Sequence, residues 1–358
     1  MKRIVIKIGT SVITNSNGSA NKEILENIIK QVVNIKKNKI DVAIVSSGAV
    51  GLGKNTFSTS SSVKKREIKS NDNAIRRKIF SSIGQIKLVN NYFNLFLKHN
   101  FFCAQILVTR DDFRSRKHFL HMRDCVEELL NHHIVPILNE NDAVVGDLSF
   151  FDNDEFAGLT AGMINADLLI ILTNVDGLFN GDPENKTSQI IHQILPHENP
   201  IKFICEKKSS LGKGGMTTKY KTAKKLSKIG IETVIANGQQ KDILLKIFQK
   251  EKIGTRFLSA KNLSPLKKWI AVSRGLEKGW VMVNQGAEKA IIQGANILPI
   301  GVIKIGGNFK KNDVVQIKNE KEENFGLGII KKDFQETINL IGQKGQKPLI
   351  HSENLFLN

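Results

Sequence analysis

Residues 2–11 read Lys2-Arg3-Ile4-Val5-Ile6-Lys7-Ile8-Gly9-Thr10-Ser11. The branched apolar residues of this run predict a short buried strand that ends in glycine and hydroxyl residues. A strand that leads into such residues can turn backbone N–H groups toward an anion. Lys7 lies near that end, and two interpretations are open: it faces solvent on an edge strand, or it points at a phosphate.

Apolar strands alternate with helical patterns from this run to about residue 250. The expected strands are Ile4–Ile8, Val42–Val45, Ala104–Val108, Ile134–Leu138, Leu168–Leu172 and Thr233–Ala236. Apolar residues at helical spacing separate the first two strands, and residues 155–164 and 217–229 predict further helices. The alternation indicates βαβ units and a mainly parallel sheet covered by helices on both faces. Ligands of such sheets bind beyond the carboxyl ends of the strands.

Polar segments follow several of these strands, at the edge where a ligand is expected. They are Gly9-Thr10-Ser11, Ser46-Ser47-Gly48-Ala49, Asn139-Glu140-Asn141-Asp142 and Thr173-Asn174. Ser47 can bond a substrate carboxylate beside the N–H groups of a helix start, or it can cap that helix. Asn141-Asp142 can contact a ligand or form a polar turn.

A second polar cluster, Asp152-Asn153-Asp154, precedes the helix expected at residues 155–164. Amides and carboxylates together can bind the amino group and the carboxylate of one small ligand. The alternative for Asp154 is an N-cap of the helix at Glu155.

Residues 212–219 read Gly212-Lys213-Gly214-Gly215-Met216-Thr217-Thr218-Lys219 and lead into the helix at 217–229. Glycines let the backbone approach a ligand, while the lysines and the helix start add positive charge. These features indicate a phosphate site, although the Walker A spacing is absent. The alternative is a flexible Gly-rich surface loop.

The composition predicts a globular chain of two domains. The chain has 358 residues with 41% hydrophobic content, and no apolar run approaches the roughly 18 residues of a membrane helix. Cys103, Cys125 and Cys205 are scattered and fit free thiols in a reducing cytoplasm. The net charge is +19, but 43 of the 53 basic residues are Lys. We interpret this excess as drift in codon composition rather than as a basic patch for nucleic acid.

The pattern changes toward the C-terminus. Residues 54–87 carry nine basic and two acidic residues and are expected to form a solvated flap that leads into a helix. We predict a first domain at residues 1–255, a linker at 256–275 and a small β-rich domain at 276–358. Residues 275–358 carry 11 basic and 9 acidic residues, a balance of +2, so RNA is not expected as the main partner.

Taken together, the order of these motifs resembles the glutamate 5-kinase family of the amino acid kinase superfamily. The segments that carry the resemblance are Lys7-Ile8-Gly9-Thr10-Ser11, Ser46-Ser47-Gly48-Ala49-Val50, Leu107-Val108-Thr109-Arg110, Arg123-Asp124, residues 137–144, Asp152-Asn153-Asp154 and residues 212–219. Residues 276–358 resemble the C-terminal PUA domain of that family.

The resemblance implies a fold and a reaction. The fold is an α/β three-layer α/β/α sandwich with a mainly parallel sheet, followed by a small β-rich PUA-like domain. The reaction is the ATP-dependent phosphorylation of the side-chain carboxylate of L-glutamate to L-glutamyl 5-phosphate, the first step of proline biosynthesis. The family implies Mg²⁺ as a cofactor, a homo-oligomer in the cytoplasm, no membrane, and the glutamyl-phosphate reductase that uses the product as a partner.

The resemblance also implies roles for individual residues. Ser47, Asp142 and Asn153 are expected to bind glutamate. The residues expected to bind ATP are Lys7, Thr173, Asn174, Lys213, Gly214, Gly215, Met216, Thr217, Thr218 and Lys219. Lys7 and Lys219 are expected to flank the transferred phosphoryl group, with Asp152 and Asp154 organising the lysines or the metal.

The chemistry suits these residue types. A glutamate side chain titrates at about pH 4.3, so it is already ionised at neutral pH and no general base is required. Catalysis then depends on positioning and on neutralising charge, which lysines and Mg²⁺ can supply. A kinase for aspartate, acetylglutamate or UMP is the alternative within the superfamily. The Lys-x-Gly-Thr-Ser run and the PUA-like tail favour glutamate.

The chain departs from the family pattern at three places that bear on the site. The family commonly has Thr-Asp at Thr173-Asn174, Gly-Thr-Gly-Gly at residues 212–215, and Lys-Gln at Arg77-Lys78. The first two changes alter expected nucleotide contacts, and the third lies in the segment expected to be a flap.

Overall fold

The computed structural model describes residues 1–61, 68, 72–144, 152–182, 185, 187–198, 215–260 and 263–357. The chain divides into two compact units. The first consists of Met1–Thr109 and Asp124–Asn262, and the second of Arg110–Arg123 and Leu263–Asn358. Among the described residues, every helix is too short or too polar to span a bilayer.

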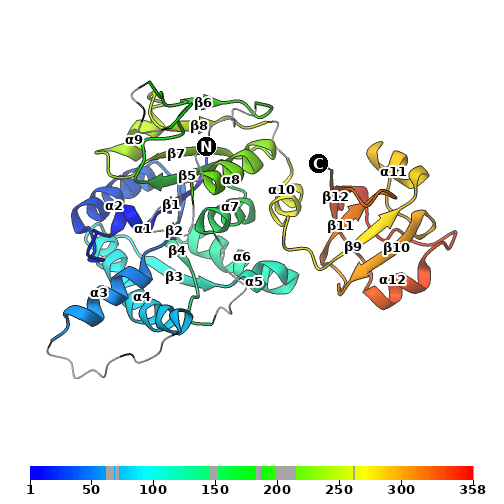
Figure 1. Ribbon diagram of the computed structural model, residues 1–358, viewed down its shortest axis with the longest axis horizontal. Helices are drawn as coiled ribbons and strands as arrows, with labels where there is room; N and C mark the ends of the chain where they lie inside the picture. Colours follow the sequence, from blue (N-terminus) through cyan, green and yellow to red (C-terminus); the bar gives the residue numbers. More distant parts are fainter. Residues whose placement is uncertain are drawn as a thin grey trace. The chain divides into compact units, whose positions relative to one another are not determined.

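The described part of the first unit is an α/β sandwich around one sheet (Figure 1). Its strands are β1 (Arg3–Ile8), β2 (Asp41–Ser46), β3 (Cys103–Val108), β4 (Val135–Glu140), β5 (Leu168–Thr173), β6 (Gln193–Ile194), β7 (Glu232–Asn237) and β8 (Thr255–Phe257). Its helices are α1 (Thr10–Ile13), α2 (Lys22–Lys37), α3 (Ala49–Thr59), α4 (Asn73–Leu97), α7 (Asn153–Met163), α8 (Met216–Lys228) and α9 (Ile243–Phe248). Two further helices are α5 (Arg110–Arg114), in the second unit, and α6 (Arg116–Asn131), whose residues belong to both units.

The strands lie in the order β3-β4-β2-β1-β5-β7-β8-β6. β1 is therefore central, and it pairs in parallel with β2 and β5. Among the described residues of this sheet, β7 and β8 are the only neighbouring strands that pair antiparallel. The register places Ile8 opposite Ser46 and Leu172, so β1, β2 and β5 end side by side at one edge of the sheet.

The two faces of the sheet carry different helices, because side chains alternate along each strand. Ile4, Ile6 and Ile8 of β1 pack in one core cluster with residues of α2, α4 and α9. The other face of β1 contacts α7, which also packs against α8 (Figure 1). Lys7 alternates with Ile6 and Ile8 and so belongs to the α7 face.

Two glycines let α3 and α4 cross at close range. A Cβ at Gly53 would lie 1.8 Å from the carbonyl oxygen of Phe80, and one at Gly84 would lie 1.8 Å from that of Ala49. No side chain fits at either place, because real Cβ atoms do not approach backbone so closely. α3 begins just after Ser47, and α4 carries Arg77 and Gln85. The close crossing therefore holds the start of α3 against α4.

The second unit contains the β-rich part of the chain. Its elements after residue 263 are α10 (Pro265–Val272), β9 (Gly279–Val283), α11 (Gln285–Ile292), η1 (Pro299–Gly301), β10 (Val302–Gly307), β11 (Val314–Lys318), β12 (Asn324–Ile329), α12 (Phe334–Leu340), η2 (Ser352–Asn354) and β13 (Leu355–Leu357). The five strands lie in the order β10-β9-β11-β12-β13 over a separate apolar core.

The architecture confirms the predicted fold class and all six strands expected before residue 250. Two short strands, β6 and β8, were not expected. Residues 54–59 belong to α3 and residues 73–87 to α4, so this segment leads into a helix as expected. The expected flap stays a prediction, because residues 62–67 and 69–71 lie outside the described residues. The domain boundaries at 255 and 276 stay a prediction, and α10 lies within the predicted linker.

Candidate active site

The centre of the candidate site is a carboxylate bound by two lysines. Lys7 Nζ lies 2.7 Å from Asp154 Oδ1, and Lys219 Nζ lies 3.0 Å from Asp154 Oδ2. Asp154 is fully buried, and Lys7 and Lys219 are 6% and 7% exposed. The three residues come from β1, α7 and α8. The interpretation of Lys7 as an edge residue is therefore wrong, because β1 is central and the ammonium group has a buried partner.

The electrostatics of this cluster favour its charged form. Burial alone would raise the pKa of Asp154, but the charges of Lys7 and Lys219 and their hydrogen bonds outweigh it and lower that pKa. Asp154 thus stays ionised and supplies the counter-charge for two buried ammonium groups. Buried charges persist only when they are paired in this way.

Asp152, and not Asp154, caps helix α7. The Asp152 carboxylate accepts a hydrogen bond from the backbone N–H of Asp154 at 2.9 Å. Asp154 lies inside the helix, so the alternative that it is the N-cap is wrong. Burial and the neighbouring charge of Asp154 raise the pKa of Asp152, partly offset by hydrogen bonds from Thr218 and the Asp154 N–H and by the charge of Lys7. Asp152 Oδ2 is buried and has no hydrogen-bond partner among the described residues.

Ser47 and Asn153 meet beside this cluster. The side-chain amide of Asn153 donates a hydrogen bond to Ser47 Oγ. Ser47 is not a helix cap: Gly48, with φ 97°, is the N-cap of α3, and no side chain bonds the first N–H groups of that helix among the described residues. A hydroxyl and a helix start with unpaired N–H groups together suit an anionic ligand.

Behind Ser47, a buried hydroxyl pair fixes the end of β2. Ser46 Oγ lies 2.9 Å from the hydroxyl oxygen of Tyr92, which is fully buried on α4. Burial raises the pKa of Tyr92 well above its usual range, so its hydroxyl stays protonated and remains a donor.

The end of β4 contacts α4 through two polar pairs. Arg77 lies 3.3 Å from Asp142, measured from Nη2 to Oδ1. The Asn139 side-chain amide donates to Gln85 Oε1 at 2.7 Å. Gln85 Nε2 is buried and has no hydrogen-bond partner among the described residues, which leaves a donor for a water or a ligand.

The residues expected to bind nucleotide lie at the ends of β5 and α8. Thr173 ends β5, and its hydroxyl lies 3.4 Å from Asn174 Oδ1. Gly215 is the N-cap of α8, which then contains Met216, Thr217, Thr218 and Lys219. Lys213 and Gly214 lie outside the described residues, so the loop that precedes α8 stays a prediction.

The structure thus brings together Lys7, Asp152, Asn153, Asp154, Ser47, Thr218 and Lys219 by direct contacts. Asp142 has its described contact with Arg77 instead. The sequence interpretation missed the contacts of Arg77, Gln85 and Tyr92. Arg77 and Gln85 lie eight positions apart and so share a face of a helix, a spacing that could have indicated α4 as part of the site.

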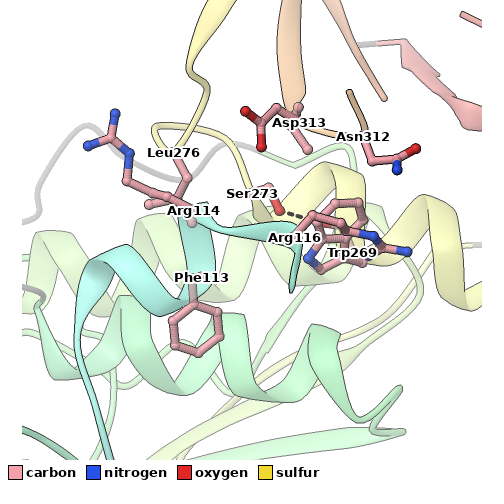
Figure 2. Close-up of a pocket in the computed structure, with 9 residues that line it drawn as sticks. Phe113, Arg114, Arg116, Trp269, Ser273, Leu276, Asn312 and Asp313 are labelled. Atoms are coloured by element: carbon pink, nitrogen blue, oxygen red, sulfur yellow. Dashed lines mark hydrogen bonds between the residues drawn. The ribbon is translucent and has the colours of Figure 1, made fainter. Parts of the chain in front are cut away.

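A small cavity of about 10 Å³ lies within the second unit (Figure 2). Arg116 lies against the Trp269 ring there, with its guanidinium carbon 4.0 Å from the ring centroid. Burial, with help from the charge of Arg123, lowers the pKa of Arg116 to about 10. A cavity of this volume holds about one water, so it is no site for a nucleotide or an amino acid.

Comparisons with known proteins match both parts of the chain. The model of the amino acid kinase family matches residues 2–237, and that of the PUA domain matches residues 279–349. Glutamate 5-kinase of Chlorobaculum tepidum is 41% identical over 361 residues, covering 99% of this chain and 97% of that protein. Glutamate 5-kinase of Bacteroides thetaiotaomicron is 35% identical over 361 residues, covering 99% and 98%.

Among solved structures, an isopentenyl phosphate kinase product complex of T. acidophilum matches with a TM-score of 0.51 at 17% identity. The match covers 72% of this chain and all of that one, and at such low identity it supports the fold alone. The fold, the family model and the full-length relatives agree. The chain therefore belongs to the amino acid kinase family and, with its PUA domain, to the glutamate 5-kinases within that family.

Proposed function

We propose that this chain transfers the γ-phosphoryl group of ATP to the side-chain carboxylate of L-glutamate, which begins proline biosynthesis. The proposal follows the name of its full-length relatives. The observation that carries it is the contact of Lys7 and Lys219 with one buried carboxylate, Asp154, at the carboxyl end of the central strand.

The reaction requires charge neutralisation more than proton transfer. A carboxylate oxygen of glutamate attacks the γ-phosphorus, the bond from that phosphorus to the bridging oxygen of ADP breaks, and ADP leaves with the electron pair. Because the attacking group is already ionised, no side chain has to remove a proton. Lys7 and Lys219 stabilise negative charge on the phosphoryl oxygens, and Asp154 keeps both ammonium groups in place before ATP arrives.

The acceptor end of the site lies beside Ser47. We assign the reacting carboxylate of glutamate to Ser47 Oγ and the N–H groups at the start of α3, with Asn153 holding Ser47. Asp142 supplies the negative charge for the ammonium group of the amino acid. These groups complement the charges that glutamate presents at the two ends of the molecule.

The nucleotide end lies at β5 and α8. Thr173 and Asn174 are assigned to the nucleoside, and the segment from Lys213 to Lys219 to its phosphates, where the N-terminus of α8 adds partial positive charge. Asn174 carries no charge where the family commonly has Asp, so it offers the nucleoside an amide in place of a carboxylate.

Mg²⁺ is part of the proposal, and the site offers one carboxylate oxygen that could bind it. The buried Asp152 Oδ2 has neither a hydrogen bond nor an ion pair among the described residues, whereas each oxygen of Asp154 forms an ion pair with a lysine. Mg²⁺ commonly takes one or two protein carboxylates and completes its shell with nucleotide phosphates and water. Asp152 is accordingly the residue assigned to hold the ion, which neutralises phosphate charge when bound.

Three further features belong to the proposal. The chain works as a homo-oligomer in the cytoplasm, and its product passes to a glutamyl-phosphate reductase. An acyl phosphate is prone to hydrolysis in water, so an enzyme that consumes it promptly protects the product.

The test is ATP consumption with a panel of amino acids and UMP, with hydroxylamine added to trap an acyl phosphate as its hydroxamate. We expect hydroxamate with L-glutamate and much less with aspartate or acetylglutamate. Turnover of another acceptor without hydroxamate from L-glutamate would overturn the proposed function.

A further inference from the structure

Arg77 is a cationic side chain at the acceptor side of the site that the proposed function leaves without a role. It lies in the first turns of α4, and both its Nη2 and its Nε approach Asp142 Oδ1, at 3.3 Å and 3.4 Å. The Asp142 side chain is 11% exposed and that of Arg77 is 34% exposed. The carboxylate is thus largely shielded, while the Arg77 side chain is only partly buried.

We infer that Arg77 recognises the α-carboxylate of the amino acid substrate, in a charge pair with Asp142, which receives the ammonium group. The inference rests on the proposed function. Both groups of the substrate sit on one carbon atom, so their receptors must be neighbours. Arg77 and Asp142 are in direct contact, and their charges are opposite to those of the two groups.

The other cations of the site are placed for the opposite end of the substrate. Lys7 and Lys219 contact Asp154 at the end of the central strand. Ser47 contacts Asn153, which lies next to Asp154 in the chain, and the strand that ends at Ser46 pairs with β1 at Ile8. Ser47 and the start of α3 therefore lie with the phosphoryl-transfer lysines. That position suits the reacting carboxylate and leaves the α-carboxylate for Arg77.

The fold holds Arg77 in position for this task. α4 cannot slide along α3, because Gly53 and Gly84 bring the two helices into backbone contact. Gln85, two turns beyond Arg77 on the same helix, accepts a hydrogen bond from Asn139 at the end of β4. A guanidinium has five N–H donors in a planar fork, so it can hold one carboxylate while it binds a second.

The experiment compares L-glutamate with its α-amide, in which a neutral carboxamide replaces the α-carboxylate. Hydroxamate formation at saturating ATP gives kcat/KM for both compounds. We expect the wild type to prefer L-glutamate by about ten- to hundredfold, the size of a charge-assisted contact. Arg77→Ala should remove most of that preference by lowering kcat/KM for L-glutamate while that for the α-amide changes little. Arg77→Lys should restore part of it.

Arg76→Ala is the matched control. Arg76 is the adjacent residue of α4, carries the same charge, is exposed, and has no ion pair among the described residues. Its loss should leave the preference for L-glutamate unchanged. Should Arg77→Ala fail to fold, Arg77→Gln replaces it, because the amide can still donate to Asp142 without a charge.

Two results would overturn the inference, and they differ from each other. An equal loss of kcat/KM for both compounds in folded Arg77→Ala would show that Arg77 only holds Asp142. No hydroxamate from L-glutamate with the wild type would overturn the proposed function itself, and this inference with it.

Discussion

The ammonium nitrogen of Lys7 lies 2.7 Å from Oδ1 of Asp154, although the two residues are 147 positions apart on β1 and α7. The contact crosses from the sheet to the helix layer that covers it. Lys219 reaches the other oxygen of the same carboxylate from α8. One buried anion therefore connects three elements of the fold, and its removal affects stability as well as the site.

Asp154→Asn should lower the free energy of unfolding by about 3–5 kcal/mol, because it leaves two buried ammonium groups without a counter-charge. Urea unfolding measures this. The pKa of Asp154 is lowered in the folded state, so its contribution is complete above its unfolded value and is lost as pH falls through the lower, folded value. The difference between wild type and variant should shrink in that acidic range. Glu155→Gln, on the same helix, is the control and should change little.

Lys219→Ala should reduce kcat by about a hundredfold or more while the KM for glutamate changes by less than about threefold. The ammonium group is assigned to charge that develops on the phosphoryl group, and such contacts stabilise the transition state more than the bound substrate. Steady-state kinetics with the hydroxamate assay measures both constants. Lys221→Ala, an exposed lysine of the same helix, should behave as wild type. Near-normal turnover of Lys219→Ala would remove the residue from the mechanism.

Asp152→Asn should make the protein more stable and less active. Burial and Asp154 raise the pKa of Asp152, so ionisation of this carboxyl opposes folding. An Asn keeps a good helix cap and removes that charge, which should add roughly 1 kcal/mol at pH 8. Below the unfolded pKa of Asp the carboxyl is neutral in both states, so the gain should vanish there. Activity should become less dependent on Mg²⁺ concentration, and an unchanged Mg²⁺ dependence would contradict the assignment of the metal.

Asp142→Ala should raise the KM for glutamate by about ten- to hundredfold and leave the KM for ATP nearly unchanged. The variant leaves Arg77 without its partner and the substrate ammonium without a counter-charge. Initial rates over both substrate concentrations separate the two constants. Equal losses for glutamate and ATP would mean that the substitution disturbs the whole sheet edge.

Gly84→Ala should destabilise the protein by about 1–3 kcal/mol or more, because its Cβ would overlap the backbone of α3. Gly51→Ala is the matched control. A Cβ at Gly51 meets nothing within 4 Å, and Ala is the better helix former, so this variant should be neutral or more stable by up to ~1 kcal/mol. Thermal unfolding of the pair decides whether the close crossing or simple helix propensity controls stability.

The sequence predicted local features well, because strand and helix periodicity is a property of neighbouring residues. The strand around Lys7 and the helix that carries Lys219 both lie where they were predicted. The polar segments after the expected strands predicted that the site lies at one edge of the sheet. The buried cluster of Lys7, Asp154 and Lys219 lies at that edge.

Contacts between distant segments could not be predicted from such patterns. Arg77 and Asp142 are 65 positions apart, and nothing in the Ser/Lys-rich run before Arg77 indicates a partner. The strands β6 and β8 have two and three residues, too few for an alternating pattern. Asp152 and Asp154 are both suitable N-cap residues, so the residue type alone does not show which of them caps α7. The backbone geometry decides it, and in the structure Asp152 is the cap.

The glycine crossing of α3 and α4 also has a consequence for motion. Two helices in backbone contact cannot separate without opening the whole interface, so their amide hydrogens should exchange with deuterium as one cooperative unit. Ser47 precedes α3 and Arg77 lies near the start of α4. The groups assigned to the two ends of the substrate would therefore be displaced together and not one at a time. Deuterium uptake along residues 49–59 and 73–97 should therefore rise in parallel with temperature, and Gly84→Ala should uncouple the two curves.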